Sequence, residues 1–158
     1  MTAQDEYFMK QAIRLAEKGM ARGAGGPFGA VIVKDNQIIA KGYNSVLSHK
    51  DPTAHAEIMA IRKASKKLNS FQLTDCTIYT SCEPCPMCLG AIYWARLSSV
   101  FYSCNRDDAA EIDFDDQHIY QEIALPVDQR QIIFTELLRL EALPLFKQWR
   151  AKSDRTDY

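Results

Sequence analysis

Residues 79–96 read YTSCEPCPMCLGAIYWAR. The stretch begins inside a strand-like segment, CTIYTS (76–81), and the prolines at 84 and 86 then suit the first positions of a helix. Cys85 and Cys88 are three residues apart, so one helical turn places both sulfurs on the same side. A helix N-terminus favours the thiolate form that a metal requires. The stretch therefore predicts a strand, then a buried helix whose first turn binds a metal.

A second group of the same chemistry lies about 30 residues upstream, where His55, Ala56 and Glu57 open a predicted helix over 53–68 with Thr53 as a candidate cap. His55 supplies a third ligand for zinc, and three protein ligands leave the fourth tetrahedral position to water, as in catalytic sites. Zinc lowers the pKa of that water from about 15.7 to near 7. Glu57 is expected to carry protons rather than bind the metal.

The cysteines also allow other interpretations. A Cys-x-x-Cys pair alone is often a structural zinc knuckle or a redox pair. A redox pair would leave His55 and Glu57 without a task, and the complete pattern of His-x-Glu followed by Pro-Cys-x-x-Cys favours a catalytic site over a structural one. Cys82 as a fourth ligand would close the site, and we expect a free buried thiol there instead. Cys76 and Cys104 lie in strand-like segments and are expected in the core.

The remaining pattern predicts one α/β domain over residues 1–158, with a mixed central sheet and helices on both faces. A first helix is expected from a cap at Thr2 to a stop at Gly19, followed by a glycine-rich loop. Four strands are expected at 28–34, 38–44, 76–81 and 99–104, with a weaker candidate at 132–138. The first of them is apolar enough to be buried on both faces of the sheet. A last helix is expected to start near residue 141.

Composition narrows the class of protein. The chain has 158 residues, 47% hydrophobic and 25% charged, with a net charge of -1. The segment 105–128 is locally acidic, with eight acids against Arg106. These balances disfavour nucleic acid and anionic membranes as partners. With no bilayer-length apolar run and no signal pattern, we expect a cytoplasmic protein.

Over nearly its whole length the sequence resembles the cytidine-deaminase-like superfamily, and more closely the bacterial guanine deaminases of that fold. The resemblance is carried by GGPFGAVIVKD (25–35), DPTAHAEIMAIRKA (51–64), YTSCEPCPMCLGAIYWAR (79–96), FDD (114–116) and a C-terminal tyrosine.

This resemblance implies a three-layer α/β/α fold with a five-stranded mixed sheet. It implies hydrolysis of guanine, a small purine base, to xanthine and ammonia. His55, Cys85 and Cys88 match the zinc ligands, and Glu57 matches the proton shuttle. It also implies a homodimer in which the C-terminal segment, about 140–158, can be exchanged and reach the other subunit's active site.

For recognition of the base, the resemblance points to Asn44, Asp116 and Tyr158, with Phe28 as a stacking wall. Guanine offers N–H donors to a carboxylate and ring acceptors to an amide. The alternatives are a tRNA adenosine deaminase, which shares both zinc motifs, and a deaminase of another free base such as cytosine. A zinc-stabilised interaction protein without catalysis has little support, because Glu57 is present.

Overall fold

Four strands form a mixed sheet in the order β2 (Gln37–Tyr43), β1 (Gly29–Lys34), β3 (Thr77–Cys82) and β4 (Ser99–Cys104). β1 pairs antiparallel with β2 and with β3, whereas β3 and β4 run parallel. The computed structural model describes residues 1–114 and 116–157. They divide into two compact units, Met1–Gln117 and His118 onward, and the sheet belongs to the first.

The expectation of a fifth strand is wrong for the described residues. Residues 133–137, from the candidate segment 132–138, have no regular secondary structure. An apolar, extended segment becomes a strand only when its N–H and C=O groups pair with a neighbouring strand. The sheet ladders of the described residues involve β1 to β4 alone.

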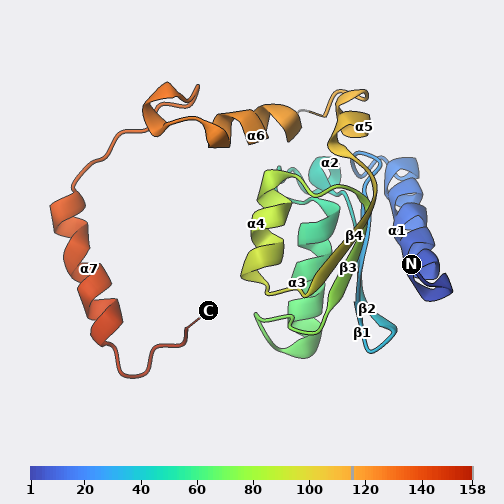
Figure 1. Cartoon of the computed structure of the whole chain (residues 1–158), viewed down its shortest axis with the longest axis horizontal. Helices are drawn as coiled ribbons and strands as arrows, with labels where there is room; N and C mark the ends of the chain where they lie inside the picture. The colour runs from blue at the N-terminus through green and yellow to red at the C-terminus, as the bar shows by residue number, and fades with distance from the viewer. Residues whose placement is uncertain (115, 158) are drawn as a thin grey trace. The chain divides into compact units, whose positions relative to one another are not determined.

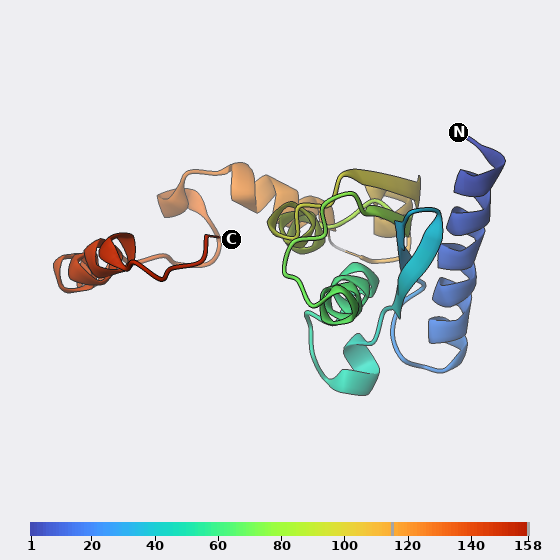
Figure 2. The ribbon, with the colours of Figure 1, turned by 90° about the horizontal axis from the view of Figure 1, so that it is seen from below.

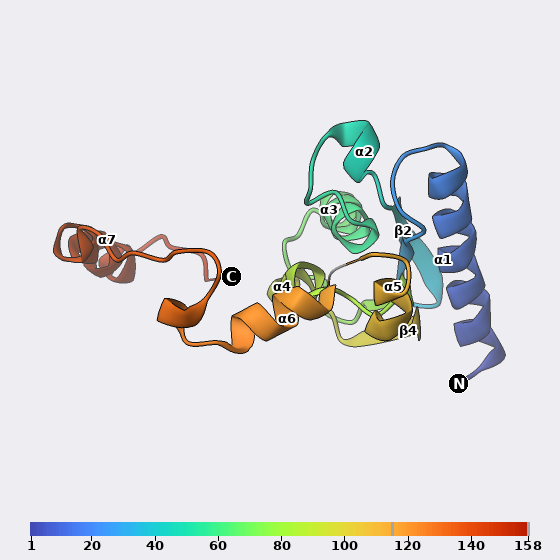
Figure 3. The same cartoon turned by 90° about the horizontal axis from the view of Figure 1, so that it is seen from above.

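Helices cover both faces of this sheet, so the three-layer arrangement is confirmed (Figure 1). α1 (Ala3–Ala21) packs on one face through Phe8 and Ala12, which meet Val31, Val33 and Tyr79. α3 (Ala56–Leu68) and α4 (Pro86–Trp94) pack on the other face, against Ala30, Ile32 and Ile78. Figure 2 shows α1 alone on its side, and Figure 3 shows α3 beside α4. β1 is buried on both faces, as its apolar run predicts.

Two glycines set how closely the helices approach the sheet. A Cβ built on Gly29 would lie 2.2 Å from the Ala12 carbonyl oxygen of α1. A Cβ built on Gly42 would lie 2.2 Å from the Ala56 carbonyl oxygen, in the first turn of α3. Any larger residue at these positions would push the corresponding helix away from the sheet.

The first helix begins as predicted. The Thr2 side chain accepts a hydrogen bond from the Asp5 amide, and the Asp5 carboxylate accepts one from the Thr2 amide, which completes a capping box. The helix continues past the expected stop at Gly19 and ends at Ala21. The second predicted helix starts later than expected: His55, not Thr53, is its N-cap, and Thr53 instead bonds to Asp51. A short helix, α2 (Val46–His49), was not predicted.

The expectation that the third helix is buried all round is wrong for this chain taken alone. In α4 only Cys88 and Ile92 are buried, while Tyr93 and Trp94 are 70% and 62% exposed. β4 is the outer strand of the described sheet, and its Cys104, expected in the core, is exposed. An apolar pattern shows that a surface is to be covered but not by which chain.

After β4 come α5 (Arg106–Ala110) and α6 (Asp116–Ala124). Beyond residue 117 the chain contains the rest of α6, a 3-10 turn (Val127–Gln129) and α7 (Arg139–Ala151). Arg130 donates to the carbonyl oxygens of Ile123 and Leu125 and lies 5.3 Å from the Phe134 ring. Many large apolar side chains are nevertheless exposed there, among them Ile132, Ile133, Phe134, Leu137, Leu140, Leu145, Phe146 and Trp149.

None of the described helices is both long and apolar enough to cross a membrane.

Candidate active site

Two helix N-termini bring the metal-binding residues together. His55 is the N-cap residue of α3 and Cys85 the N-cap residue of α4, both with extended backbone, and Cys88 lies in the first turn of α4. Pro86 follows directly as the first helical residue, where its missing N–H costs nothing. The partial positive charge at both helix ends favours thiolates at this position.

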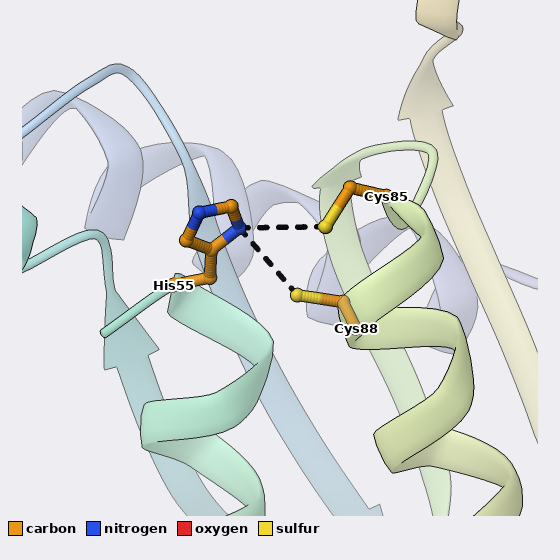
Figure 4. Close-up of side chains that lie close together, drawn as sticks. All are labelled: His55, Cys85 and Cys88. Carbon is orange, nitrogen blue, oxygen red and sulfur yellow. Dashed lines mark hydrogen bonds between the residues drawn. The ribbon is translucent and has the colours of Figure 1, made fainter. Parts of the chain in front are cut away.

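The geometry of the three side chains fits zinc. His55 Nδ1 lies 3.6 Å from Cys85 Sγ and 3.6 Å from Cys88 Sγ (Figure 4). Tetrahedral zinc, with Zn–N near 2.0 Å and Zn–S near 2.3 Å, separates such N and S atoms by about 3.5 Å. The three donor atoms all lie within 4.8 Å of one another. This separation and the donor set match a zinc site with three protein ligands.

Cys82 lies outside this cluster, in agreement with the expectation of a free buried thiol. Its Sγ contacts the carbonyl oxygen of Asn105 at 3.5 Å, and burial raises the pKa of the thiol to about 12. The group of donor atoms that lie close enough together to hold one metal ion contains His55, Cys85 and Cys88 but not Cys82. Among the described residues, the cluster therefore keeps three protein ligands.

The ligands themselves show strongly shifted acidities. A hydrogen bond from the Cys88 thiol, together with one from His55, lowers the pKa of Cys85 to about 4. The same bond to Cys85, with burial, raises the pKa of Cys88. The bond to Cys85 also raises the pKa of His55, and the charges of Glu57 and Asp116 act in the same direction. A cation bound between the two sulfur atoms would favour the thiolate form of both.

Glu57 stands beside the cluster in the first turn of α3 and is only 6% exposed. Burial raises the pKa of its carboxyl group. The carboxyl also has hydrogen bonds with its own backbone amide and with the Cys88 thiol, and it accepts one from the Thr80 hydroxyl at 3.4 Å. A buried carboxyl of raised pKa next to a metal site is suited to accept and return protons near neutral pH.

Comparison with known proteins agrees with this geometry. Residues 2–104 match the family description "Cytidine and deoxycytidylate deaminase zinc-binding region". The chain belongs to this family of zinc-binding deaminases. Zinc is therefore its metal cofactor, as the two sequence motifs predicted.

Individual family members are similar to different extents. Guanine deaminase of Bacillus subtilis is 56% identical over 97% of this chain and 98% of its own length. Its crystal structure superposes with a TM-score of 0.94, with 54% identity over 100% of this chain and 99% of that one. Guanine deaminase from Nitrosomonas europaea gives a TM-score of 0.66 with 29% identity, covering 92% of this chain and 84% of that one. The tRNA-specific adenosine deaminase of Aquifex aeolicus is 46% identical over 62% of this chain and 64% of its own length.

Phe28 and Asn44, two of the residues expected to bind the base, are neighbours in this deaminase domain. The backbone N–H of Asn44 donates to the backbone carbonyl oxygen of Phe28 at 2.9 Å. The Phe28 side chain packs on the core cluster that contains Ala56. Asn44 is 3% exposed, and its Oδ1 accepts a hydrogen bond from the Val46 amide. Asn44 thus also supports the start of α2, so it has a local structural role as well.

Of the other two residues expected to bind the base, Asp116 and Tyr158, the structure describes only Asp116. Asp116 is the first residue of α6, near enough for its charge to act on His55 and Cys82. Tyr158 lies outside the described residues. Trp94, which belongs to the helix predicted to be buried, is exposed on α4.

The motifs alone missed two residues of this region. Phe114 meets Phe28 edge to face, with 4.7 Å between ring centroids. Thr80 bonds Glu57 from β3. The strand alternation in residues 76–81 could have revealed Thr80, because it puts this polar residue on the same sheet face as the apolar Ile78.

Proposed function

We propose that this deaminase catalyses the zinc-dependent hydrolysis of guanine to xanthine and ammonia. The observation that carries the proposal is the 56% identity to Bacillus subtilis guanine deaminase over 97% of the chain. The likeness to the Aquifex tRNA adenosine deaminase covers 62% of the chain. The acidic segment 105–128 also disfavours a polyanionic substrate near the metal.

His55, Cys85 and Cys88 would hold the zinc, and Glu57 is the catalytic residue of the proposal. Bound zinc supplies a water that is acidic enough to act as nucleophile at neutral pH. Glu57 would accept one proton from this water and pass it to the ring nitrogen, and would then accept the second proton from the hydroxyl group of the adduct and pass it to the departing amine. The water oxygen adds at the carbon that carries the exocyclic amine, and the C–N bond to that amine then breaks. Loss of ammonia leaves a carbonyl group, as in xanthine.

Four residues hold the base in this proposal. Phe28 provides an apolar wall for the purine ring. Asn44 presents its amide nitrogen to a ring acceptor, since its Oδ1 is already bonded to Val46. The Asp116 carboxylate accepts N–H donors of guanine, and Tyr158 covers the base.

The active unit of the proposal is a homodimer. Residues 1–158 form one functional domain, of which about 140–158 is exchanged between the two subunits. Exposed apolar side chains support this arrangement, because each of the two units carries them separately. The cytoplasm is the proposed location, and the five free cysteines agree with a reducing compartment.

A substrate panel tests the proposed reaction. Zinc-loaded protein is offered guanine, adenine, cytosine and cytidine, and the products are followed by ultraviolet absorbance and identified chromatographically. We expect xanthine from guanine and no turnover of the other three. Silence on guanine with stoichiometric zinc would refute the proposal, and tRNA would be tested next for binding and deamination at two salt concentrations.

The substitution Glu57→Gln tests the proposed proton transfer, because it keeps the size of the side chain but removes the carboxyl group that carries the proton. It should retain zinc and fold while the rate falls at least about a hundredfold, the low end for acid–base catalysis. Near-normal turnover would contradict the role of Glu57.

A further inference from the structure

Thr80 is a polar residue at a position that otherwise suits an apolar one. It lies in β3 between β1 and β4, in register with Ala30 and Tyr102. It is 1% exposed and shares the α3 face of the sheet with Ile78. A hydroxyl group buried there costs free energy of folding unless it is hydrogen-bonded, and valine would fill the same volume without that cost.

The partner of this hydroxyl is the carboxyl group of Glu57. Thr80 Oγ1 donates to Glu57 Oε1 at 3.4 Å, and both side chains are buried. The bond joins β3 to the first turn of α3, and its two residues are 23 positions apart in the sequence. It therefore restrains the rotation of Glu57 from the side of the sheet.

The chemistry of a hydroxyl suits a group that gains and loses a proton in each reaction cycle. A hydroxyl can donate to an ionised carboxylate and can accept from a protonated carboxyl, whereas a backbone amide can only donate. Thr80 can consequently stay bonded to Glu57 in both forms. A valine would leave Glu57 without this restraint.

We propose that Thr80 is a positioning residue that holds the carboxyl group of Glu57 in its reactive orientation. The proposal rests on the proposed deaminase function. Thr80 acts through Glu57 and is not expected to touch the base.

The first test compares substitutions that separate the hydroxyl group from side-chain volume. Thr80→Val keeps the shape and should lose about tenfold in kcat, with KM within about twofold of wild type, since the interaction with Glu57 matters in the transition state. Thr80→Ser keeps the hydroxyl and should retain most of the activity. Thr77→Val, in the same strand on the opposite face, should behave as wild type. Zinc content and melting temperature are measured for each variant.

The pair Thr80→Ser and Thr80→Ala repeats the comparison with small side chains, so the test does not depend on the stability of Thr80→Val. A purely structural Thr80 would make activity follow melting temperature. A positioning Thr80 makes activity follow the hydroxyl. Equal kcat in the serine and alanine variants would overturn the proposal.

A double-mutant cycle identifies the residue through which Thr80 acts. In a Glu57→Gln background, Thr80→Val should cause no further loss of rate, because the group it positions has been removed. A full additional tenfold loss would overturn the proposal. A wild-type protein that forms no xanthine would refute the deaminase function together with the role of Thr80, whereas active wild type with unchanged Thr80→Val would refute only the latter.

Discussion

At the scale of single residues, two buried cysteines that look alike in the sequence have different roles in the structure. Cys82 and Cys88 are both buried, six residues apart, yet only Cys88 lies within reach of His55. The difference arises from the strand that ends at Cys82 and the helix that begins at Pro86. The strand directs one sulfur to the Asn105 carbonyl, and the helix turns the other toward the metal position.

We predict that serine substitutions at these two cysteines have opposite outcomes. Cys88→Ser should purify with well under one zinc per chain and lose activity, because a ligand is removed. Cys82→Ser should keep about one zinc per chain, since its sulfur is not a ligand. Metal analysis by mass spectrometry checks both. Equal zinc loss in the two variants would show that Cys82 belongs to the metal site.

At the scale of elements, α1 is fixed to the sheet by a bond between its first turn and β3. The Tyr79 hydroxyl donates to Asp5 Oδ1 at 2.7 Å, and Asp5 also completes the helix cap. The hydrogen bond from Tyr79, followed by those from Thr2, lowers the pKa of Asp5. A carboxyl group whose pKa is lowered by folding stabilises the fold above its unfolded pKa, and this contribution disappears as the pH falls through the folded value.

We therefore expect Tyr79→Phe to be less thermostable than wild type at pH 7 and to approach it in acid, as the pH falls through the lowered pKa of Asp5 and the carboxyl group becomes protonated in both proteins. Thermal unfolding followed by circular dichroism at several pH values measures this difference. Tyr7→Phe, at a half-exposed tyrosine of the same helix, is the control and should show no such dependence. A gap in melting temperature that is the same at both pH values would rule out the role of Asp5 ionisation.

The contact of β2 with α3 gives a second prediction for the elements. Gly42→Ala places a Cβ against the Ala56 carbonyl, adjacent to both His55 and Glu57. We expect a loss of about 1–3 kcal/mol in unfolding free energy from this overpacking, together with reduced activity. Gly90→Ala, where an added Cβ meets no described atom within 4 Å, should be neutral or slightly stabilising. Denaturant titration distinguishes the two, and an unaffected Gly42→Ala would show that α3 shifts without cost.

Sequence patterns anticipated the elements that local chemistry determines. The capping box at Thr2, the doubly buried β1 and the helix start at Pro86 follow from residues close together in the chain. The patterns gave wrong predictions where pairing or burial depends on residues far away in the sequence. Residues 132–138 look like a strand but lack a paired neighbour among the described residues, and Trp94 looks like core but lies exposed. The bond from Thr80 to Glu57 needed the register of β3 against the helices, which no local pattern contains.

At the scale of the whole molecule, the proposed exchange makes each active site a product of two chains. Glu57 and the metal ligands would come from one subunit and Tyr158 from the other. The dimer should have about twice the 17.9 kDa mass of the chain, measurable by light scattering.

A complementation experiment tests the exchange. One variant carries Glu57→Gln with an intact tail, and the other keeps Glu57 but lacks residues 153–158; each alone should be nearly inactive. Co-expressed in equal amounts, they should recover about one quarter of wild-type activity, because about half of the dimers are mixed and each mixed dimer has one complete site. A tail that serves its own subunit would give no recovery. Mixing two preparations of the same variant is the control.

The outer strand β4 also bears on how a cell handles this protein. Among the residues that the structure describes, β4 pairs only with β3, and a strand with one unpaired edge and exposed Val100 and Tyr102 is a template for pairing with another extended chain. In the proposed homodimer, a newly synthesised subunit carries this surface until it assembles, so slow assembly would favour aggregation. Stability then becomes a function of concentration: the melting temperature should rise as the protein is concentrated and fall on dilution.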